Sequence, residues 1–464
     1  MSKIPAHQPD ARIATNVRWG TNMAQDSIEM LKPDVATRLS RVSAGRWFSA
    51  VPERVLRRIR AHLLDVLDRI EWGSIQLRDA LGSRTLGAAT AVGPRVEVDV
   101  HDLEFYAHAG LGGSTGAGQS YFMGLWDTDQ LVDVVRILVR NAAILERMDS
   151  GLARIGAPLW QWYHRRRENT LQGSRNNISA HYDLGNDFFE VMLDPTMMYS
   201  SAIYPDASAD LETAQRHRLD VICDKLALGP ENHLLEIGTG WGGLAIHAAS
   251  RHGCRVTTTT ISRAQHDYAV HRVAAAGLSD LIDVRFDDYR ELTGQYDRLV
   301  SVEMIEAVGH RQFPTYFATL DRLLTADGLA LLQAITIEDQ RYAAYRDSVD
   351  FIQRFVFPGG CLPSLGVMLD CIRDHTTLKV RHVEDIGDHY ARTLMDWQTR
   401  VDVGSNKLNA LGYDQTFLRL WRFYLAYCTG GFMERSIGDV QLLLQKPLCR
   451  VTTPVSGAVG RPYS

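Results

Sequence analysis

The stretch LLEIGTGWGGLAIHAAS, residues 234–250, decides the fold. Its pattern is typical of a buried strand, a glycine turn and the start of an amphipathic helix. The turn contains Gly238, Gly240, Gly242 and Gly243, which lack Cβ and so permit positive φ and a close approach of a nucleotide to the backbone. The stretch therefore predicts a cofactor site, with a tight turn that binds no ligand as the alternative.

An acidic residue before the glycines separates this turn from a dinucleotide-binding motif. The spacing is GxGxGG instead of GxGxxG, and Glu236 lies at the end of the strand instead of about twenty residues downstream. An acidic residue ahead of GxGxG is the usual opening of S-adenosylmethionine (SAM) methyltransferases. The motif therefore favours SAM as the cofactor.

Strands and helices alternate regularly around this stretch. The apolar periodicity predicts strands over 233–237, 255–260, 282–286, 296–303 and 329–337, and helices over 211–227, from 242, over 262–276 and over 313–324. Such alternation predicts an α/β fold with a doubly wound, mainly parallel sheet, whose ligands bind beyond the carboxyl ends of the strands. We therefore expect residues 238–243, 260–265, 287–289 and 303–309 to share one rim.

The length of 464 residues exceeds what one hydrophobic core normally serves. We expect a mobile arm over 1–44, a small α+β domain over 45–150, a basic linker over 151–178 and a Rossmann-like catalytic domain over 179–464. In the small domain, the pattern predicts a helix over 51–67, strands over 74–79, within 89–102 and around 103–107, and a further helix before residue 141.

Composition excludes several classes of protein. Hydrophobic residues make up 45% of the chain and charged residues 23%, as in soluble globular proteins. The net charge of −5 argues against nucleic acid as a partner. No apolar run reaches the roughly 18 residues that span a bilayer, and no signal peptide is evident, so we expect a cytoplasmic protein. Six cysteines without CxxC spacing predict neither a disulfide framework nor a zinc site.

Six motifs, the glycine turn among them, occur in order: HYDLGNDFFEVMLDPTMMYSSAIY (181–204), LLEIGTGWGG (234–243), SVEMIEAVGH (301–310), FVFPGGCLPS (355–364), HYARTLMDW (389–397) and YCTGGF (427–432). Together they resemble the cyclopropane-fatty-acyl-phospholipid synthase family, which includes mycolic acid cyclopropane synthases and fatty-acid C-methyltransferases. The resemblance implies that SAM donates a methyl group to the cis double bond of an unsaturated acyl chain in phospholipid. The product implied is a cyclopropane, formed through a carbocation that bound bicarbonate deprotonates.

The resemblance implies eight residues around SAM: Tyr199, Ser200, Glu236, Gly238, Gly240, Thr260, Gln265 and Tyr289. Tyr199 and Ser200 match contacts to its carboxylate end. Thr260 and Gln265 match contacts to the ribose or the methionine, and Tyr289 matches an aromatic residue beside the adenine.

The resemblance also implies a bicarbonate site. Glu306 and Tyr390 match bicarbonate ligands, and Ile335 matches a backbone amide donor. A carboxyl group beside bicarbonate requires one of the two to keep a proton, which burial favours by raising the pKa. The alternatives are a helix-terminal carboxylate for Glu306 and a core tyrosine for Tyr390.

Three further positions are assigned to the reaction site. Ser201 stands where many relatives have cysteine and is expected to act through its backbone amide. Gln333 stands where many relatives have a histidine that donates to bicarbonate; an amide can donate but cannot become cationic. Cys428 matches a cysteine near the site, with a small buried hydrophobe as the alternative.

An alkene is a weak nucleophile, so its methylation builds a carbocation that must be shielded from water and relieved of a proton. We therefore expect a dry acyl tunnel, lined by residues after the core sheet: Phe351, Ile352, Phe355, Phe357, Leu362, Leu365, Met368, Leu394 and Trp397. The expected partners are phospholipid acyl chains at the inner membrane surface and a second copy of the chain. The alternatives are a methylene- or methyl-branched product, with a separate reductase as partner, an N- or O-methyltransferase, and an inactive lipid-binding protein.

Overall fold

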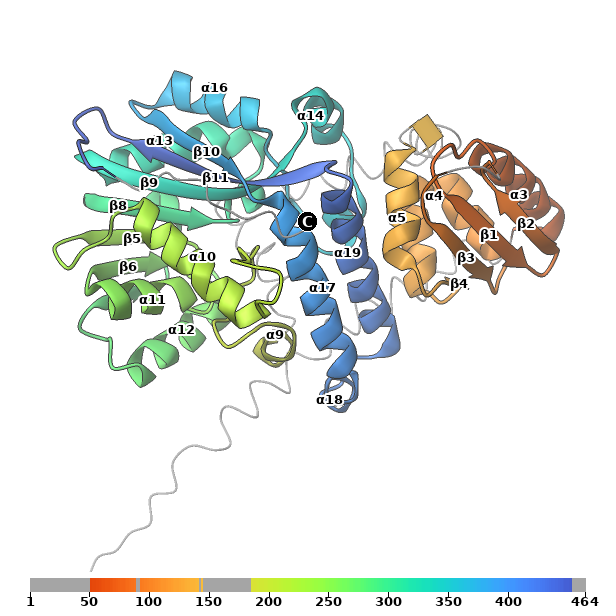
Figure 1. Ribbon diagram of the computed structural model, residues 1–464, viewed down its shortest axis with the longest axis horizontal. Coiled ribbons are helices and arrows are strands. Elements are labelled where there is room, and N and C mark those ends of the chain that lie inside the picture. Colours follow the sequence, from red (N-terminus) through yellow and green to blue (C-terminus); the bar gives the residue numbers. More distant parts are fainter. Residues whose placement is uncertain (1–50, 89–91, 142, 145–184, 453–464) are drawn as a thin grey trace, which may run out of the picture.

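The computed structural model describes residues 51–88, 92–141, 143–144 and 185–452 (Figure 1). The predicted N-terminal arm and nearly all of the predicted basic linker lie outside these ranges. So do the predicted domain boundaries after residues 44, 150 and 178, which therefore stay predictions.

A seven-stranded sheet of order β10-β11-β9-β8-β5-β6-β7 forms the centre of the larger unit. Its strands are β5 (His233–Ile237), β6 (Arg255–Thr259), β7 (Ile282–Arg285), β8 (Tyr296–Val302), β9 (Leu324–Ile337), β10 (Lys379–Asp385) and β11 (Ile437–Gln445). Strands β5 to β9 pair in parallel, whereas β11 runs antiparallel to β9 and β10. The predicted doubly wound, mainly parallel α/β fold is confirmed.

Helices cover both faces of this sheet (Figure 1). One face packs against α10 (Leu211–Lys225), α11 (Gly243–His252) and α12 (Arg263–Ala275). The other packs against α13 (Phe313–Leu323) and α16 (Leu365–His375). Alternate residues of one strand enter opposite cores, with Leu331 on the first face and Leu332 on the second, as the two-residue period of a strand requires.

The segments after β9 add a helical layer beside the carboxyl ends of the strands. It consists of α14 (Asp339–Arg346), α15 (Phe351–Phe355), α17 (Gly387–Val403), α18 (Ser405–Ala410) and α19 (Gln415–Met433), with α9 (Asn186–Met192) from before the sheet. Short 3-10 turns η2 (Tyr289–Glu291), η3 (Ile305–Ala307) and η4 (His310–Gln312) follow β7 and β8. Helix α17 packs along α19 and against α9.

A smaller unit precedes these elements. Its sheet has the order β2-β1-β3-β4, from β1 (Ser74–Asp79), β2 (Gly82–Leu86), β3 (Arg95–Val100) and β4 (Trp126–Asp127). Its helices are α3 (Glu53–Leu67), α4 (Glu104–Phe122) and α5 (Leu131–Arg140). The predicted strand around 103–107 is wrong: Asp102 accepts a hydrogen bond from the Glu104 amide at the start of α4, and packing of α4 on α3 outweighs the strand preference of Phe105 and Tyr106.

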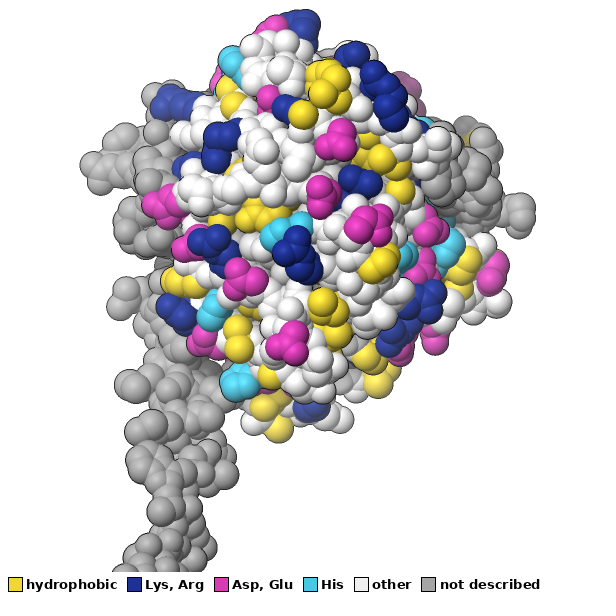
Figure 2. Space-filling view, turned by 90° about the vertical axis from the view of Figure 1, so that its left-hand side faces the viewer, with side chains coloured by type: hydrophobic (Ala, Val, Ile, Leu, Met, Phe, Trp, Pro, Cys, Tyr) yellow, Lys and Arg dark blue, Asp and Glu magenta, His cyan; other side chains and the backbone are white. Residues whose placement is uncertain are grey.

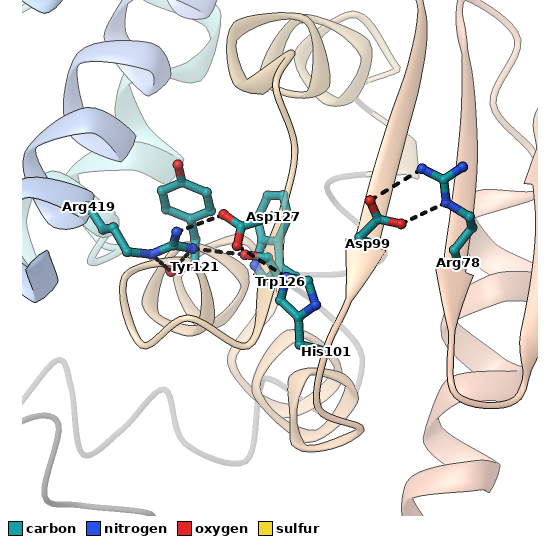
Figure 3. Close-up of polar contacts among 7 residues, drawn as sticks. All are labelled: Arg78, Asp99, His101, Tyr121, Trp126, Asp127 and Arg419. Atoms are coloured by element: carbon teal, nitrogen blue, oxygen red, sulfur yellow. Dashed lines mark hydrogen bonds and ion pairs between the residues drawn. The ribbon is translucent and has the colours of Figure 1, made fainter. Parts of the chain in front are cut away.

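The smaller unit docks on α19 by packing of α4 and α5 and by ion pairs, of which Arg419 makes the most contacts. Arg419 donates to the carbonyl oxygens of Tyr121 and Trp126 and to Asp127, at 2.6 to 2.9 Å (Figure 3). Its guanidinium also lies 4.2 Å from the ring centre of Tyr121. Arg136 on α5 adds an ion pair of 2.7 Å to Glu434, just after α19. Helices α4 and α5 therefore face the carboxyl ends of the catalytic strands.

Figure 2 shows the end of the larger unit that faces away from the small unit. Lys and Arg are interspersed with Asp and Glu there. Among the residues that the structure describes, no helix combines the length and the apolar character that crossing a bilayer requires.

Candidate active site

A cavity of about 1580 Å³ lies beyond the carboxyl ends of β5, β6, β7 and β8. The predicted residues that line it are Tyr199, Ser200, Glu236, Gly238, Gly240, Thr260, Gln265, Tyr289, Glu306, Ile335, Tyr390 and Cys428. Ser201 and Gln333 are buried directly behind the wall, with 0% and 1% of their surface exposed. The structure thus brings all of the predicted site residues together around one cavity.

The glycine turn between β5 and α11 leaves room for a ligand. The amides of Gly238 and Thr239 both donate to the carbonyl oxygen of Thr259, at 3.0 Å, which holds the turn against β6. Gly240 has a φ of +52°, and a Cβ built on it would meet no atom of the described chain within 4 Å. The turn therefore has the left-handed backbone that glycine permits, next to open space.

Polar groups from three strand ends surround this turn. Glu236 accepts a 2.6 Å hydrogen bond from Thr258, and burial raises the pKa of Glu236 to about 8. Thr260 donates to the amide oxygen of Gln265 at 3.0 Å. The hydroxyl of Tyr289 is buried and has no hydrogen-bond partner among the described residues. The open space beside the glycine turn and the unpaired hydroxyl of Tyr289 fit the adenosine and amino acid groups of SAM.

Tyr199 and Ser200 lie where the cofactor end of the cavity meets the helical layer. The Tyr199 and Tyr424 hydroxyls are 2.9 Å apart. The Ser200 hydroxyl accepts a 2.8 Å hydrogen bond from Arg218, a fully buried guanidinium on α10. Arg218 is thus a buried positive charge close to the site, which the sequence analysis missed.

The reaction end of the cavity centres on Glu303, directly after β8. One carboxylate oxygen, Oε1, accepts hydrogen bonds from the Ser201 amide and from the Gln333 side chain, both at 2.8 Å. The other, Oε2, accepts from the Tyr390 hydroxyl at 2.6 Å. Glu303 also lines the cavity. Three groups assigned to the reaction site thus converge on one carboxylate of the chain itself.

A chain of hydrogen bonds determines which way the Gln333 amide points. Lys225, which also pairs with Glu384, donates to the oxygen of Gln441 at 2.7 Å. Gln441 then donates to the oxygen of Gln333 at 3.1 Å. Because an ammonium group can only donate, this polarity turns the Gln333 NH2 group toward Glu303 and, at 3.0 Å, Asp439.

Glu306 lies beside this cluster in a different state of pairing. Its Oε1 accepts from the Ile335 amide at 2.5 Å, and its Oε2 has no partner among the described residues. Burial, and then the charge of Glu303, raise the pKa of Glu306 to about 8. Glu306 is therefore protonated at neutral pH.

Burial also raises the pKa values of Glu303 and Asp439. Donation by Tyr390 and Ser201 and the charge of Arg218 oppose this rise at Glu303. The charge of Arg218 acts on both Glu303 and Asp439, and Glu303 has the most donors of the three carboxyl groups. It is the carboxyl group best stabilised as an anion.

The predicted bicarbonate donors are consequently engaged. Tyr390, Ser201 and Gln333 donate to Glu303, and the Ile335 amide donates to Glu306. Among the described residues these groups do not offer bicarbonate a free strong donor. Of the predicted ligands only the protonated Glu306 keeps an unpaired oxygen, Oε2, so the donor set as a whole does not fit bicarbonate as arranged. Cys428 lines the cavity as predicted, but a thiol is a weak donor.

The sequence analysis placed residue 303 on the rim yet selected Glu306 from the same motif. The available signal was position, since Glu303 follows β8 as Gly238 follows β5, and the ends of adjacent parallel strands meet at a binding crevice. Asp439 and Lys225 carried no such signal, because β11 and α10 meet the site only through tertiary packing.

The apolar part of the cavity is only partly the one predicted. Ile352, Phe357, Leu362 and Leu394 line it. The others pack against the hydrophobic core instead: Phe351, Phe355, Leu365, Met368 and Trp397. The small unit supplies lining that was not predicted, from α4 and α5: Leu111, Leu138 and Val139.

Comparisons with known proteins identify relatives of this chain. A family model described as mycolic acid cyclopropane synthetase matches residues 169–442. Tuberculostearic acid methyltransferase UfaA1 of Mycobacterium tuberculosis is 37% identical over 83% of this chain and 88% of its own. The cyclopropane-fatty-acyl-phospholipid synthase of Escherichia coli K12 is 36% identical over 75% and 86%. The crystal structure of mycolic acid cyclopropane synthase CmaA1 complexed with SAH and CTAB has a TM-score of 0.55 and 30% identity, covering 59% of this chain and 98% of its own.

Proposed function

Because the chain belongs to the mycolic acid cyclopropane synthetase family and is a SAM-dependent methyltransferase, we propose that it methylates the cis double bond of an unsaturated acyl chain in phospholipid. The observation that carries this proposal is a single cavity with two different ends. The glycine turn and its polar neighbours form one end, and apolar side chains such as Ile352 and Leu394 form the other. Its volume, about 1580 Å³, exceeds the roughly 300–1,000 Å³ of a usual small-molecule site.

SAM, when bound, supplies an electrophilic methyl group on a sulfonium ion. The residues that would hold it are those of the turn around Gly240, with Gln265 and Tyr289. The relative CmaA1 supports this division of the cavity, since its structure contains SAH, the demethylated form of SAM, and CTAB, a long-chain surfactant. The apolar walls exclude water, which would otherwise capture the carbocation.

We propose a cyclopropane acyl chain as the product, supported by the E. coli relative, which is a cyclopropane-fatty-acyl-phospholipid synthase. A methylene-branched chain is the second candidate. It is supported by the relative named tuberculostearic acid methyltransferase, which aligns over 83% of this chain against 75% for the E. coli synthase. A branched product would require a separate reductase to become a methyl branch.

The proposed substrate places the protein in the cytoplasm, against the inner surface of the membrane. Helices α4 and α5 of the small unit support a lipid-directed role for that unit, since Leu111, Leu138 and Val139 form part of the apolar wall.

We also propose a homodimer as the working form; sedimentation of the purified chain at several concentrations tests it.

The experiment that tests the function is expression in a host whose phospholipids contain oleoyl chains, followed by mass spectrometry of the acyl chains. We expect a new acyl species that contains one carbon more than oleate in a main chain of unchanged length. Mild hydrogenation then separates the products, because a methylene group is reduced and a cyclopropane resists. Unchanged oleate in cells that contain folded protein would refute the proposal.

A further inference from the structure

Glu303 has a backbone conformation that only a specific requirement explains. Its φ is +46°, in the left-handed region that residues with a side chain seldom adopt. Such residues concentrate at functional sites, where the surrounding structure imposes the conformation. Glu303 comes directly after β8 in the chain, and this conformation brings its carboxylate to the wall of the cavity.

The three groups that contact this carboxylate are all hydrogen-bond donors, which favours its ionised form. The Ser201 amide has only an N–H to offer, and the Lys225–Gln441–Gln333 chain presents an NH2 group. Tyr390 completes the set. A carboxylate has about four acceptor positions, and three are used, two on Oε1 and one on Oε2. The remaining position belongs to Oε2, on a residue that faces the cavity.

The neighbouring carboxyl groups do not compete for this role. Glu306 has one donor, the Ile335 amide, and Asp439 has one, the Gln333 side chain. Their second oxygens have no partner among the described residues. The charge of Arg218 favours the ionised forms of both Glu303 and Asp439, and the three donors select Glu303 as the anion.

We propose that the Glu303 carboxylate is the base that deprotonates the methylated acyl chain, in the place assigned to bicarbonate. This inference rests on the proposed function. The anion is then part of the chain and is already positioned by Ser201, Gln333 and Tyr390, so turnover needs no dissolved carbonate.

The step balances without an oxidant or reductant. Methyl transfer leaves the acyl chain as a carbocation. A lone pair on Oε2 of Glu303 accepts a proton from the new methyl carbon, and the electron pair of that C–H bond closes the cyclopropane ring. For a methylene product, a hydride shift along the chain comes first, and the same electron pair forms the C=C bond. Glu303 is left neutral and returns its proton to solvent before the next turnover.

Dependence on bicarbonate in the wild-type protein is the first test. Full-length protein is assayed with SAM and oleoyl phospholipid vesicles in buffer stripped of CO2, with and without added sodium bicarbonate. We expect the same rate in both. A rate that collapses in stripped buffer and recovers with bicarbonate would overturn the inference. Absence of product in both buffers would refute the proposed function itself, so the two failures are distinguishable.

Two substitutions at residue 303 sharpen the test. Glu303→Gln keeps the shape but cannot accept a proton, so we expect turnover to fall by roughly 10²–10⁴-fold, the usual contribution of a positioned base, with SAM affinity by calorimetry unchanged. The matched control is Glu231→Gln, at an exposed glutamate before β5, which should turn over normally. Wild-type turnover by Glu303→Gln would contradict the inference.

Glu303→Gly suits the left-handed backbone and frees the donors of Ser201, Gln333 and Tyr390. We expect this variant to be inactive alone and to recover with added formate or bicarbonate, in a saturable manner. Glu303→Gln should not recover, because its amide still fills the space. If Glu303→Gly binds SAM but neither anion restores it, the inference fails. Should both variants misfold, the bicarbonate dependence of the wild type still decides.

Discussion

Tyr390 shows how one hydroxyl tunes the site. Its ring stacks on Phe432 at 4.5 Å, and its hydroxyl donates to Glu303 at 2.6 Å. That donation opposes the effect of burial and so lowers the pKa of Glu303. The ring and the hydroxyl can be separated experimentally, because phenylalanine preserves the stacking.

We predict that Tyr390→Phe lowers kcat/KM by about 10-fold or more. Without the donor, the pKa of Glu303 rises further, so less of it is ionised at a given pH and the acid limb of the pH–rate profile moves to higher pH. The matched control is Tyr204→Phe, which removes a buried hydroxyl that donates to Asp396 away from the cavity. An acid limb that stays in place in Tyr390→Phe would contradict this account of Glu303.

Glu306 makes a second prediction, about stability. Its pKa is about 8 in the folded protein and near 4.5 when unfolded, so between these values the folded state binds a proton that the unfolded state lacks. The free energy of unfolding therefore decreases as pH rises through this interval. Glu306→Gln mimics the protonated form and removes this loss. Urea unfolding should show the variant gaining on the wild type, by a few kcal/mol in total, as pH rises from 4.5 to 8.

Glu236, whose pKa is also about 8, contributes the same pH dependence to the stability of both proteins. A stability difference that is independent of pH would show that Glu306 is not held protonated in the fold.

At the scale of elements, the turn between β5 and α11 carries the cofactor prediction. We predict that Gly240→Val abolishes measurable SAM binding by calorimetry, because the side chain would enter the open space beside the turn. The control is Gly277→Val. Gly277 also has a positive φ, +69°, and open space around it, but it does not line the cavity. Both variants share the backbone strain, so equal SAM affinities would overturn the assignment of the turn.

The elements that sequence predicts well are those with local signals. Strands β5 to β9 were predicted because buried runs such as His233–Ile237 alternate with amphipathic helices. Strand β11 was not, because its place between β9 and β10 depends on long-range pairing, as in Leu442 opposite Leu332. The strand predicted around 103–107 failed because α4 packs on α3, a contact that strand preference does not register.

The residues of the site also divide into those with a local sequence signal and those that only tertiary contacts bring together. Gly238, Tyr390 and Gln333 could be selected from motifs, and the structure brings them to one cavity or its wall. Their mutual hydrogen bonds, and so the donors that converge on Glu303, could not be predicted. Likewise Trp397 was expected to line the tunnel, yet it is fully buried behind Tyr199 and Tyr390.

At the scale of the molecule, the small unit forms part of the cavity wall and is held there by Arg419. We predict that Arg419→Ala destabilises the protein by on the order of 2–4 kcal/mol, since it removes hydrogen bonds from a largely buried guanidinium. Turnover on vesicles should fall as well, because the small unit, with α4 and α5, loses the contacts that Arg419 makes from α19. Urea unfolding and a vesicle assay measure the two effects.

Figure 3 contains the control for this substitution. Arg78 pairs with Asp99 on the outer face of the small sheet, where both side chains are about half exposed. Arg78→Ala should cost less than about 1 kcal/mol and leave turnover unchanged. Equal effects of the two substitutions would mean that the docking of the small unit does not depend on Arg419.

Transfer of a labelled methyl group by the purified full-length protein tests the central claim most directly. Vesicles of one phospholipid class are offered in two forms, with oleoyl chains or with stearoyl chains, together with SAM labelled in its methyl carbon. We expect label in the oleoyl chains alone, in an added carbon that is bonded to the carbons of the former double bond. Label in stearoyl chains, in the head group or in neither lipid would contradict it.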